Sequence, residues 1–327
     1  MSLWKLRLTM LGTLAIIIGT STAFFAVLLQ YFGSLNIISL AALVALFNIV
    51  QWLFAPHLIN AIYRVKEVKP TDFPKLQAII DQLSRKSGIK KPKLGIASIP
   101  IPNAFAYGSQ LTGNHVAITQ GLLDTLEEEE VEAVLGHELG HLKHRDVQIM
   151  MLISFLPSLL YLIGRSALYS AYFGGYYGRN KRGGSGLAVL IGMASMAVYF
   201  VLLLFVLGLS RLREYYADRH SVSIVEDGPR KLSEGLAKIV SKTGRMRMHH
   251  QKEAFTFSSF KTLFISDPDR AERDVAEIAQ YTSISSDQGL VERLLKRRVT
   301  TADRIMELLS THPNITKRLK ALQALGT

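Results

Sequence analysis

The chain has 327 residues, of which 49% are hydrophobic and 20% are charged. Lys and Arg number 38 against 26 Asp and Glu, giving a formal net charge of +12, and there is no cysteine. The lack of cysteine excludes a disulfide framework, an iron–sulfur cluster and a thiolate zinc site, so any metal must be held by His, Asp or Glu. Because the basic residues often flank apolar runs, the charge favours a lipid bilayer rather than nucleic acid as the partner.

Four apolar runs approach or exceed the roughly 20 residues that cross the hydrocarbon core of a bilayer. They cover about residues 8–32, 37–59, 147–163 and 187–209. Pro157 and Arg165 interrupt the third run or its extension, so a buried soluble helix remains an alternative there. We expect four transmembrane helices.

Basic residues at both ends of the first two runs orient the chain. Lys5 and Arg7 precede them, and Arg64, Lys66 and Lys69 follow them. Since cytoplasmic flanks are enriched in Lys and Arg, both ends of this hairpin should be cytoplasmic. The sequence therefore predicts a multi-pass protein of the plasma membrane whose polar domain faces the cytoplasm.

The polar region after the second run combines helix and strand signals. Residues 71–86 carry apolar side chains at helical spacing and end at Gly88, which predicts a helix. Three short runs that are typical of strands follow. They cover residues 93–99, 103–107 and 115–119.

A second helix is expected to begin near Thr125. Thr125 and Glu128 have the spacing of a capping box, and the acidic run 127–130 suits the positive end of a helix dipole. Beyond residue 210 the chain is again polar and helical. Candidate helices there cover 229–242, 270–280, 290–298, 302–310 and 315–325. We expect a mostly α, α+β fold with a small β-sheet, plus four transmembrane helices.

His137, Glu138 and His141 form an H-E-x-x-H pattern in the second predicted helix. Positions i and i+4 share one helix face, so both imidazoles can reach the same ion. Zinc lowers the pKa of a bound water towards about 7. The Glu138 carboxylate can then take a proton during attack on a peptide carbonyl and pass it to the leaving amine. The pattern indicates a zinc metalloendopeptidase with one Zn²⁺ per chain.

A catalytic zinc site needs a third protein ligand and an open fourth position. Glu214 and Asp218 are also spaced i and i+4. Glu214 would bind zinc, and Asp218 would accept a hydrogen bond from a ligating His and so fix its tautomer. The same spacing fits a surface helix with ion pairs to Arg211 and Arg213 equally well.

These motifs resemble the HtpX-type membrane zinc proteases, relatives of the CAAX prenyl endopeptidases in the gluzincin group. The resemblance rests on H-E-L-G-H followed by Asp146, an apolar hairpin and the segment S-R-L-R-E-Y-Y-A-D that contains Glu214. It extends to P-N-A-F-A around Asn103 and to T-H-P around His312, followed by Arg318. It covers the chain from the first apolar run almost to the C-terminus.

The resemblance implies a gluzincin-type fold and a role in stress response, with cleavage of misfolded or damaged membrane proteins at the cytoplasmic face. It implies that Asn103 holds substrate main chain beside an edge strand and that His312 stabilises the oxyanion. From the residues alone, a turn Asn and a helix-capping His before Pro313 are the simpler interpretations. Asp146, Asp218 and Arg318 would lie behind the metal ligands and support them.

We divide the chain into four segments. They are an N-terminal transmembrane hairpin (1–62), a first part of the catalytic domain (63–146), a second transmembrane hairpin (147–209) and a second part of the catalytic domain (210–327). If one ion binds Glu214 and both histidines, residues 147–209 must cross the membrane twice or not at all. The charge bias disfavours placing the basic loop 179–182 on the far side, a conflict that a shallow re-entrant hairpin would resolve.

Two other functions fit parts of the pattern. An intramembrane, site-2-type zinc protease would need H-E-x-x-H within a span, but the helix here carries too many charges for hydrocarbon. A non-catalytic adaptor with a structural zinc site would not need Glu138. Ser221 stands where the family often has a small apolar residue, which we expect to matter little, and residues 265–300 match no motif.

Overall fold

The computed structural model describes residues 37–69, 71–109, 111–177, 184–248, 265, 271 and 286–326. The chain divides into two compact units. The helical unit comprises Met1–Trp52 and Gln148–Leu207, and the sheet unit comprises Leu53–Val147 and Gly208–Thr327. The first predicted span, residues 8–32, lies outside the described residues.

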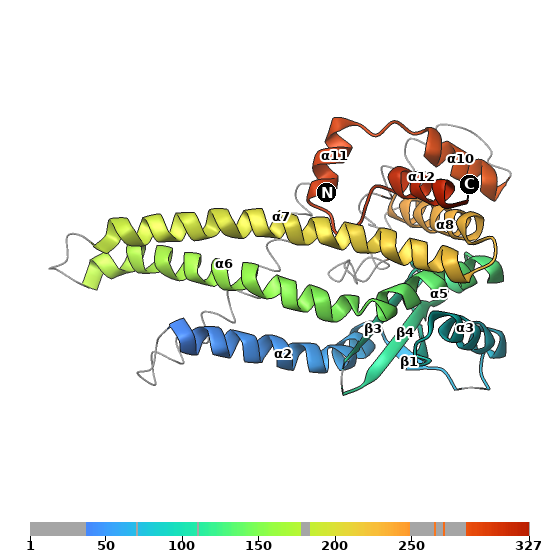
Figure 1. The fold of residues 1–327 in the computed structure, drawn as a ribbon, viewed down its shortest axis with the longest axis horizontal. Coiled ribbons are helices and arrows are strands. Elements are labelled where there is room, and N and C mark those ends of the chain that lie inside the picture. Colours follow the sequence, from blue (N-terminus) through green and yellow to red (C-terminus); the bar gives the residue numbers. More distant parts are fainter. Residues whose placement is uncertain are drawn as a thin grey trace. The chain divides into compact units, whose positions relative to one another are not determined.

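Three long helices enter the helical unit: α2 (Ile37–Ile62), α6 (Asp146–Tyr177) and α7 (Gly184–Ile224). Within this unit α6 and the first half of α7 lie side by side (Figure 1). The ring centroids of Tyr161 and Tyr199 are 5.2 Å apart, and a Cβ added at Gly192 would meet Leu168. From Tyr161 to Leu168 the residue numbers rise along α6, whereas those of their α7 neighbours fall from Tyr199 to Gly192. The two helices are therefore antiparallel and form a hairpin.

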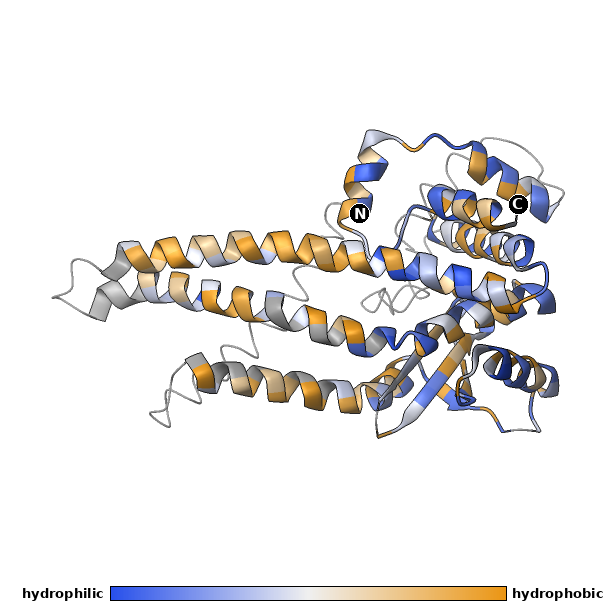
Figure 2. Cartoon of the chain, in the orientation of Figure 1, coloured by the Kyte–Doolittle hydropathy of each residue, from blue (hydrophilic) through white to orange (hydrophobic). Residues whose placement is uncertain are grey.

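Among the described residues, one helical stretch is long and apolar enough to cross a membrane. It covers Gly186–Ile224. Figure 2 shows that the first half of α7 is largely hydrophobic and that its end is hydrophilic. Leu190 and Phe205 in the first half are 64% and 71% exposed. Such exposed apolar surface suits a lipid environment.

The sheet unit contains a four-stranded mixed sheet in the order β1-β2-β4-β3. β2 and β4 are parallel, whereas β1 pairs antiparallel with β2 and β3 pairs antiparallel with β4. The strands are β1 (Val65–Glu67), β2 (Lys93–Ala97), β3 (Ala104–Ser109) and β4 (Gly113–Thr119). The three predicted strands are confirmed, and the short β1 was missed. The order leaves β3 at an edge of the sheet.

Helix α5 (Glu128–Lys143) is the central element of this unit. It contacts β3, β4 and helices α3 and α8, and it supplies Val131, Val134, Leu135 and Leu139 to the main hydrophobic core. The remaining helices are α3 (Pro74–Ser87), α4 (Gln120–Leu123), α8 (Gly228–Met248), α10 (Asp287–Lys296), α11 (Thr301–Leu308) and α12 (Ile315–Gly326). A mostly helical fold with a small mixed sheet is thus confirmed, while the helix expected at 270–280 lies almost entirely outside the described residues.

The predicted start of α5 at Thr125 was wrong by two residues. The N-cap is Glu127, whose backbone N–H donates to the Glu130 carboxylate at 2.9 Å. Thr125 instead donates its hydroxyl to the Gly121 carbonyl at 2.6 Å, in the turn that follows α4. Thr125 therefore closes the preceding turn, because a hydroxyl can bond back four residues as readily as it can cap a helix.

Candidate metal centre

Two glycines in α5 allow α7 to approach closely. A Cβ added at Gly140 would lie 3.0 Å from the Ala217 Cα, and one added at Gly136 would lie 2.9 Å from the Ser221 Oγ. The Ser221 hydroxyl donates to the Ala133 carbonyl across this contact at 2.6 Å. Contrary to our expectation, Ser221 therefore matters to the packing of α5 against α7. The contact brings the end of α7 against the H-E-x-x-H face.

His137, His141 and Glu214 converge on one point. The two Nε2 atoms are 3.2 Å apart, and Glu214 oxygens lie 3.7 Å from His137 Nε2 and 3.5 Å from His141 Nε2. Tetrahedral zinc with ligands at about 2.0–2.2 Å would separate its ligand atoms by about 3.4 Å. The two nitrogens and the carboxylate thus match a zinc site in chemistry and in spacing, and among the described residues they form a group able to hold a metal.

One carboxylate oxygen of Glu214 is buried without a hydrogen bond in the part of the chain that the structure describes. Its Oε2 is buried and has no hydrogen-bond partner among the described residues, although Arg318 Nη1 lies 3.3 Å away. A buried carboxylate oxygen without a hydrogen bond is costly unless an ion satisfies it. The alternative of a surface helix is wrong, because Glu214 and Asp218 are 7% and 2% exposed.

A carboxylate lies behind each histidine. Asp218 Oδ1 is 2.9 Å from His137 Nδ1, and Asp146 Oδ2 is 2.5 Å from His141 Nδ1. In each case Nδ1–H can donate to the carboxylate, which leaves Nε2 with a lone pair for a metal. Asp146 also forms an ion pair with Arg213 at 3.0 Å. The structure therefore shows which carboxylate serves which histidine.

The buried charges shift the pKa values of these groups. Burial lowers the pKa of His137 to about 4, and the Arg318 charge adds to this effect. Burial lowers the pKa of His141 as well, but the hydrogen bond with Asp146 and the charge of Glu214 outweigh it and leave that pKa raised. Burial would raise the pKa of Asp218, yet the Arg318 guanidinium holds it at about 2. At neutral pH His137 is therefore neutral and Asp218 is ionised.

Glu138 lies beside the ligands without joining them. It is 3% exposed, and burial raises the pKa of its carboxyl to about 7. The charge of His141 and a hydrogen bond with the Ala106 main chain oppose that rise. Because Ala106 belongs to β3, this carboxylate is tied to the edge strand of the sheet.

The structure gives Asn103 and His312 different surroundings. Asn103 is 1% exposed, and its Oδ1 accepts from the Ile265 N–H at 2.9 Å. The Ile265 carbonyl accepts from Arg318 Nη1 at 2.7 Å. His312 Nε2 lies 3.8 Å from Glu214 Oε1. The chain thus places His312 beside the metal ligands, while the Asn103 carbonyl already holds main chain.

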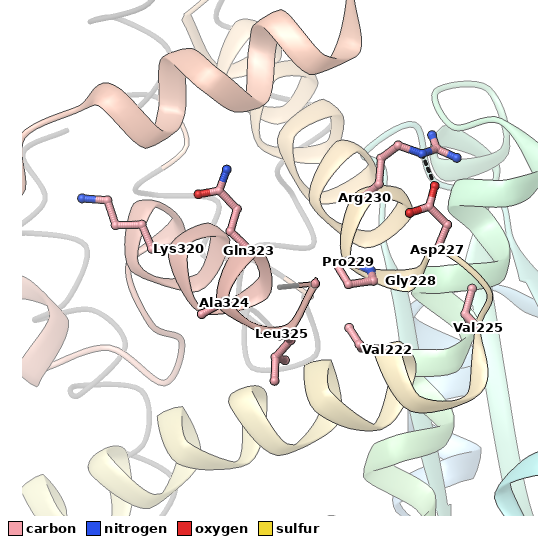
Figure 3. A pocket seen from close by; sticks show the side chains of 11 residues that line it. Val222, Val225, Asp227, Gly228, Pro229, Arg230, Lys320, Gln323, Ala324 and Leu325 are labelled. Carbon is pink, nitrogen blue, oxygen red and sulfur yellow. Dashed lines mark hydrogen bonds and ion pairs between the residues drawn. The ribbon is translucent and has the colours of Figure 1, made fainter.

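A separate hollow of about 1000 Å³ lies between the C-terminal end of α7, the start of α8 and the end of α12 (Figure 3). Val222, Asp227, Arg230 and Lys320 line it. None of the metal-binding candidates lines it, and Arg230 is paired there with Asp227. This hollow is distinct from the metal centre.

Sequence reasoning missed Arg213, the Gly136–Gly140 pair and the packing role of Ser221. Arg213 was assigned only to a possible surface ion pair, and it instead contacts Asp146. The spacing of Gly136 and Gly140 in G-H-E-L-G-H was a usable signal, because two small residues four positions apart lie on one helix face and allow a close helix contact. The Arg213 partner carried no signal, since Asp146 lies 67 positions earlier in the chain.

A metal-binding trio that joins H-E-x-x-H on one helix to a glutamate from a distant helix is the arrangement of a metalloprotease. Comparison with known proteins identifies the family: the model of peptidase family M48 matches residues 70–325. The chain belongs to peptidase family M48, and it is a membrane metalloprotease of the HtpX type.

Relatives described as Protease HtpX homologs cover most of the chain. One from Thermoplasma acidophilum is 36% identical over 305 residues, 90% of this chain and 89% of the relative. One from Aeropyrum pernix is 40% identical over 279 residues, 85% of this chain and 83% of the relative. One from Saccharolobus islandicus is 36% identical over 328 residues, 98% of this chain and 97% of the relative.

The fold is also similar to a solved structure. The crystal structure of S. mikatae Ste24p matches 98% of this chain with a TM-score of 0.54 and 15% identity. The match covers 66% of the Ste24p chain, just under two thirds. At this identity the likeness supports the fold alone.

Proposed function

We propose that the chain is a zinc-dependent endopeptidase that binds one Zn²⁺ through His137, His141 and Glu214. The observation that carries the proposal is the convergence of two imidazole nitrogens and the Glu214 carboxylate, whose atoms lie 3.2–3.7 Å apart, with one carboxylate oxygen buried and without a hydrogen bond among the described residues. When bound, zinc would act as a Lewis acid on water and on the peptide carbonyl. The Asp146 and Asp218 carboxylates keep both imidazoles in the ligating tautomer.

Glu138 is the general base and acid of this proposal. In the metal-free chain burial raises the pKa of its carboxyl to about 7, and it lies next to His137 on the helix that carries both histidines. It takes a proton from the attacking water and gives it to the leaving amine. The hydrogen bond with the Ala106 main chain fixes it beside β3, where a substrate peptide would lie.

The edge strand β3 offers a place for substrate main chain. An extended peptide can add to an exposed sheet edge through main-chain hydrogen bonds. Asn103 precedes β3 directly, and in this structure its Oδ1 accepts from the Ile265 N–H. A substrate N–H that used this oxygen would take the place of Ile265.

His312 supplies the remaining group of the proposed mechanism. Its Nε2 faces Glu214 at 3.8 Å, so it lies at the rim of the position that the metal would fill. A donor at that place stabilises the negative charge that develops on the carbonyl oxygen during attack.

We further propose four membrane spans in two hairpins, with the catalytic domain at the cytoplasmic face. The antiparallel pair α6 and α7 and the exposed apolar side chains of α7 support the second hairpin. The basic residues that flank residues 8–59 support the orientation. Because Glu214 follows the apolar run 187–209 by five positions in the sequence, we propose that the site lies close to the bilayer surface. That position suits exposed loops and ends of misfolded membrane proteins as substrates.

The test is the variant Glu138→Gln in detergent-purified full-length protein, with zinc content and casein cleavage measured together. We expect one zinc per chain in both proteins and no cleavage by the variant. Zinc retained with wild-type cleavage would overturn the role of Glu138. A wild-type protein that binds zinc but cleaves nothing would instead favour a non-catalytic adaptor.

The ligand set is tested separately with Glu214→Ala. We expect zinc content to fall well below one per chain and cleavage to be lost with it, because two histidines alone hold zinc weakly. Full zinc retention would show that Glu214 is not the third ligand.

A further inference from the structure

Arg211 joins the helix that carries Glu214 to the segment that carries His312. Its Nη1 donates to the carbonyls of Glu307, Leu308 and Ser310 at 2.7, 3.2 and 2.8 Å. Neither the H-E-x-x-H chemistry nor the metal ligands use this arginine. Its guanidinium instead binds main-chain carbonyls within the sheet unit.

The three carbonyls lie at and just beyond the end of α11. This helix ends at Leu308, so its last carbonyls lack the i+4 N–H of a continuing helix, although the Glu307 carbonyl also accepts from the Ser310 N–H at 3.1 Å. A cation at this position satisfies them and interacts favourably with the negative end of the helix dipole. Arg211 thus fixes the place where the chain leaves α11 and turns towards His312.

Short-range bonds continue from this point to the imidazole. The Ser310 hydroxyl oxygen accepts from the His312 backbone N–H at 3.3 Å, and Thr311 Oγ1 lies 2.9 Å from His312 Nδ1. These contacts leave Nε2 directed towards Glu214 at 3.8 Å. An unbroken series of hydrogen bonds therefore runs from Arg211 to the ring that faces the metal ligands.

At its other end, the series of hydrogen bonds begins in helix α7, which also carries Glu214. Arg211 precedes Glu214 by three residues in α7, so one helical turn separates the anchor of the His312 segment from the third ligand. A rigid turn sets the distance between the two groups better than the loop could alone. Arg211 and Glu214 together therefore relate the His312 segment to the third proposed ligand.

We propose that Arg211 is a positioning residue that places His312 against the metal centre through the carbonyls of residues 307–310. The inference rests on the proposed function, because it requires that His312 act in peptide cleavage. A donor must stand within hydrogen-bond distance of the developing oxyanion to be effective. Arg211 holds the segment at that distance, and it touches neither substrate nor metal.

The experiment is a double-mutant cycle in the full-length zinc enzyme with Arg211→Gln and His312→Ala. We expect Arg211→Gln to lower kcat about 10- to 100-fold, with KM nearly unchanged and one zinc per chain. His312→Ala should lower kcat about 10²- to 10³-fold. The double variant should be no slower than His312→Ala alone, because the arginine acts only through the histidine.

Arg219→Gln is the matched control, since this exposed arginine lies on the same helix two turns further on. It should keep wild-type kcat. Arg211→Lys should restore part of the lost rate, because an ammonium can still donate to some of the carbonyls. It also completes the cycle if Arg211→Gln does not fold.

Multiplied losses in the double variant would overturn the proposal and leave the protease function intact. Loss of zinc in Arg211→Gln would also overturn it, since the arginine would then support the metal site itself. Wild-type kcat in His312→Ala would remove the proposed role of His312 and this inference with it. Glu138→Gln, measured beside them, reports separately on the protease function.

Discussion

Arg318 and Asp218 form a buried bidentate ion pair across 100 positions of the chain. Arg318 Nε donates to Asp218 Oδ2 and Nη2 donates to Oδ1, each at 2.6 Å. Both residues are 2% exposed. The same carboxylate faces His137 Nδ1 at 2.9 Å, and the same guanidinium lies 3.3 Å from Glu214. The Arg318 guanidinium thus holds the carboxylate that faces one proposed ligand, His137, and lies beside another, Glu214.

Asp218→Ala should therefore weaken both metal binding and the fold. His137 loses the acceptor that fixes its tautomer, so zinc affinity should fall about 10- to 100-fold in a chelator competition. Arg318 would be left buried without its main partner, which destabilises by about 3–5 kcal/mol in a chemical unfolding experiment. Unchanged zinc affinity would contradict the orienting role.

The double variant Asp218→Leu with Arg318→Met separates the two effects. Replacing both members of a buried ion pair with apolar side chains is often neutral for stability. We expect the double variant to recover stability relative to Asp218→Ala and to keep the weakened zinc affinity.

The pH dependence of the metal-free protein should report on Glu138. Burial raises the pKa of its carboxyl from 4.5 to about 7, so the folded state favours the protonated form. The unfolded chain releases this proton at lower pH, and folding stability is therefore lost as pH rises from about 4.5 to 7. The loss is on the order of 3 kcal/mol at most, since one pKa unit corresponds to about 1.4 kcal/mol.

The substitution Glu138→Gln replaces this carboxyl with an amide that does not titrate. In chelator-treated protein the variant should be more stable than the wild type at pH 8, and the difference should shrink towards pH 4. Chemical unfolding of both proteins across this range measures it. Parallel pH profiles would show that Glu138 titrates normally in the folded state.

Gly140→Ala should separate α5 from α7. The new Cβ would stand 3.0 Å from the Ala217 Cα, and backbone cannot give way as a flexible side chain can. We expect a stability loss of about 1–3 kcal/mol from overpacking and reduced zinc content, because Glu214 and the histidines come from the two helices.

The matched control is Gly235→Ala in α8. Its Cβ would meet only ordinary contacts, beginning at 3.5 Å. This substitution should be neutral or stabilise the protein by up to about 1 kcal/mol, because alanine favours a helix interior more than glycine does. Equal losses from both substitutions would show that the close α5–α7 contact is not the cause.

Asn103 is tested by comparing Asn103→Asp with Asn103→Ala. Aspartate keeps an oxygen for the Ile265 N–H and loses the amide donors, whereas alanine leaves that buried N–H unpaired. We expect alanine to lower stability by about 1–3 kcal/mol and aspartate to lower it less. A role in substrate binding predicts a raised KM for casein in both variants. Wild-type KM in the alanine variant would leave Asn103 with a structural role only.

Much of the fold and part of the site followed from local patterns in the sequence. The i,i+4 spacing of His137 and His141 places both rings on one helix face wherever that helix lies. Three short runs that are typical of strands, within residues 93–119, predicted three strands. The same local logic failed at Thr125, whose hydroxyl bonds back to the Gly121 carbonyl while Glu127 and Glu130 form the capping box.

The sequence by itself predicted the chemistry of this protein: a metal site without cysteine, two histidines and a candidate base close together on one helix, and apolar runs long enough for a bilayer. Only the tertiary structure decided that Glu214 is buried with them and that Asp218 serves His137. It alone placed Arg211 on the carbonyls before His312. The reason is physical, because helical spacing fixes neighbours within one turn, whereas partners about 100 residues apart are chosen by how helices pack.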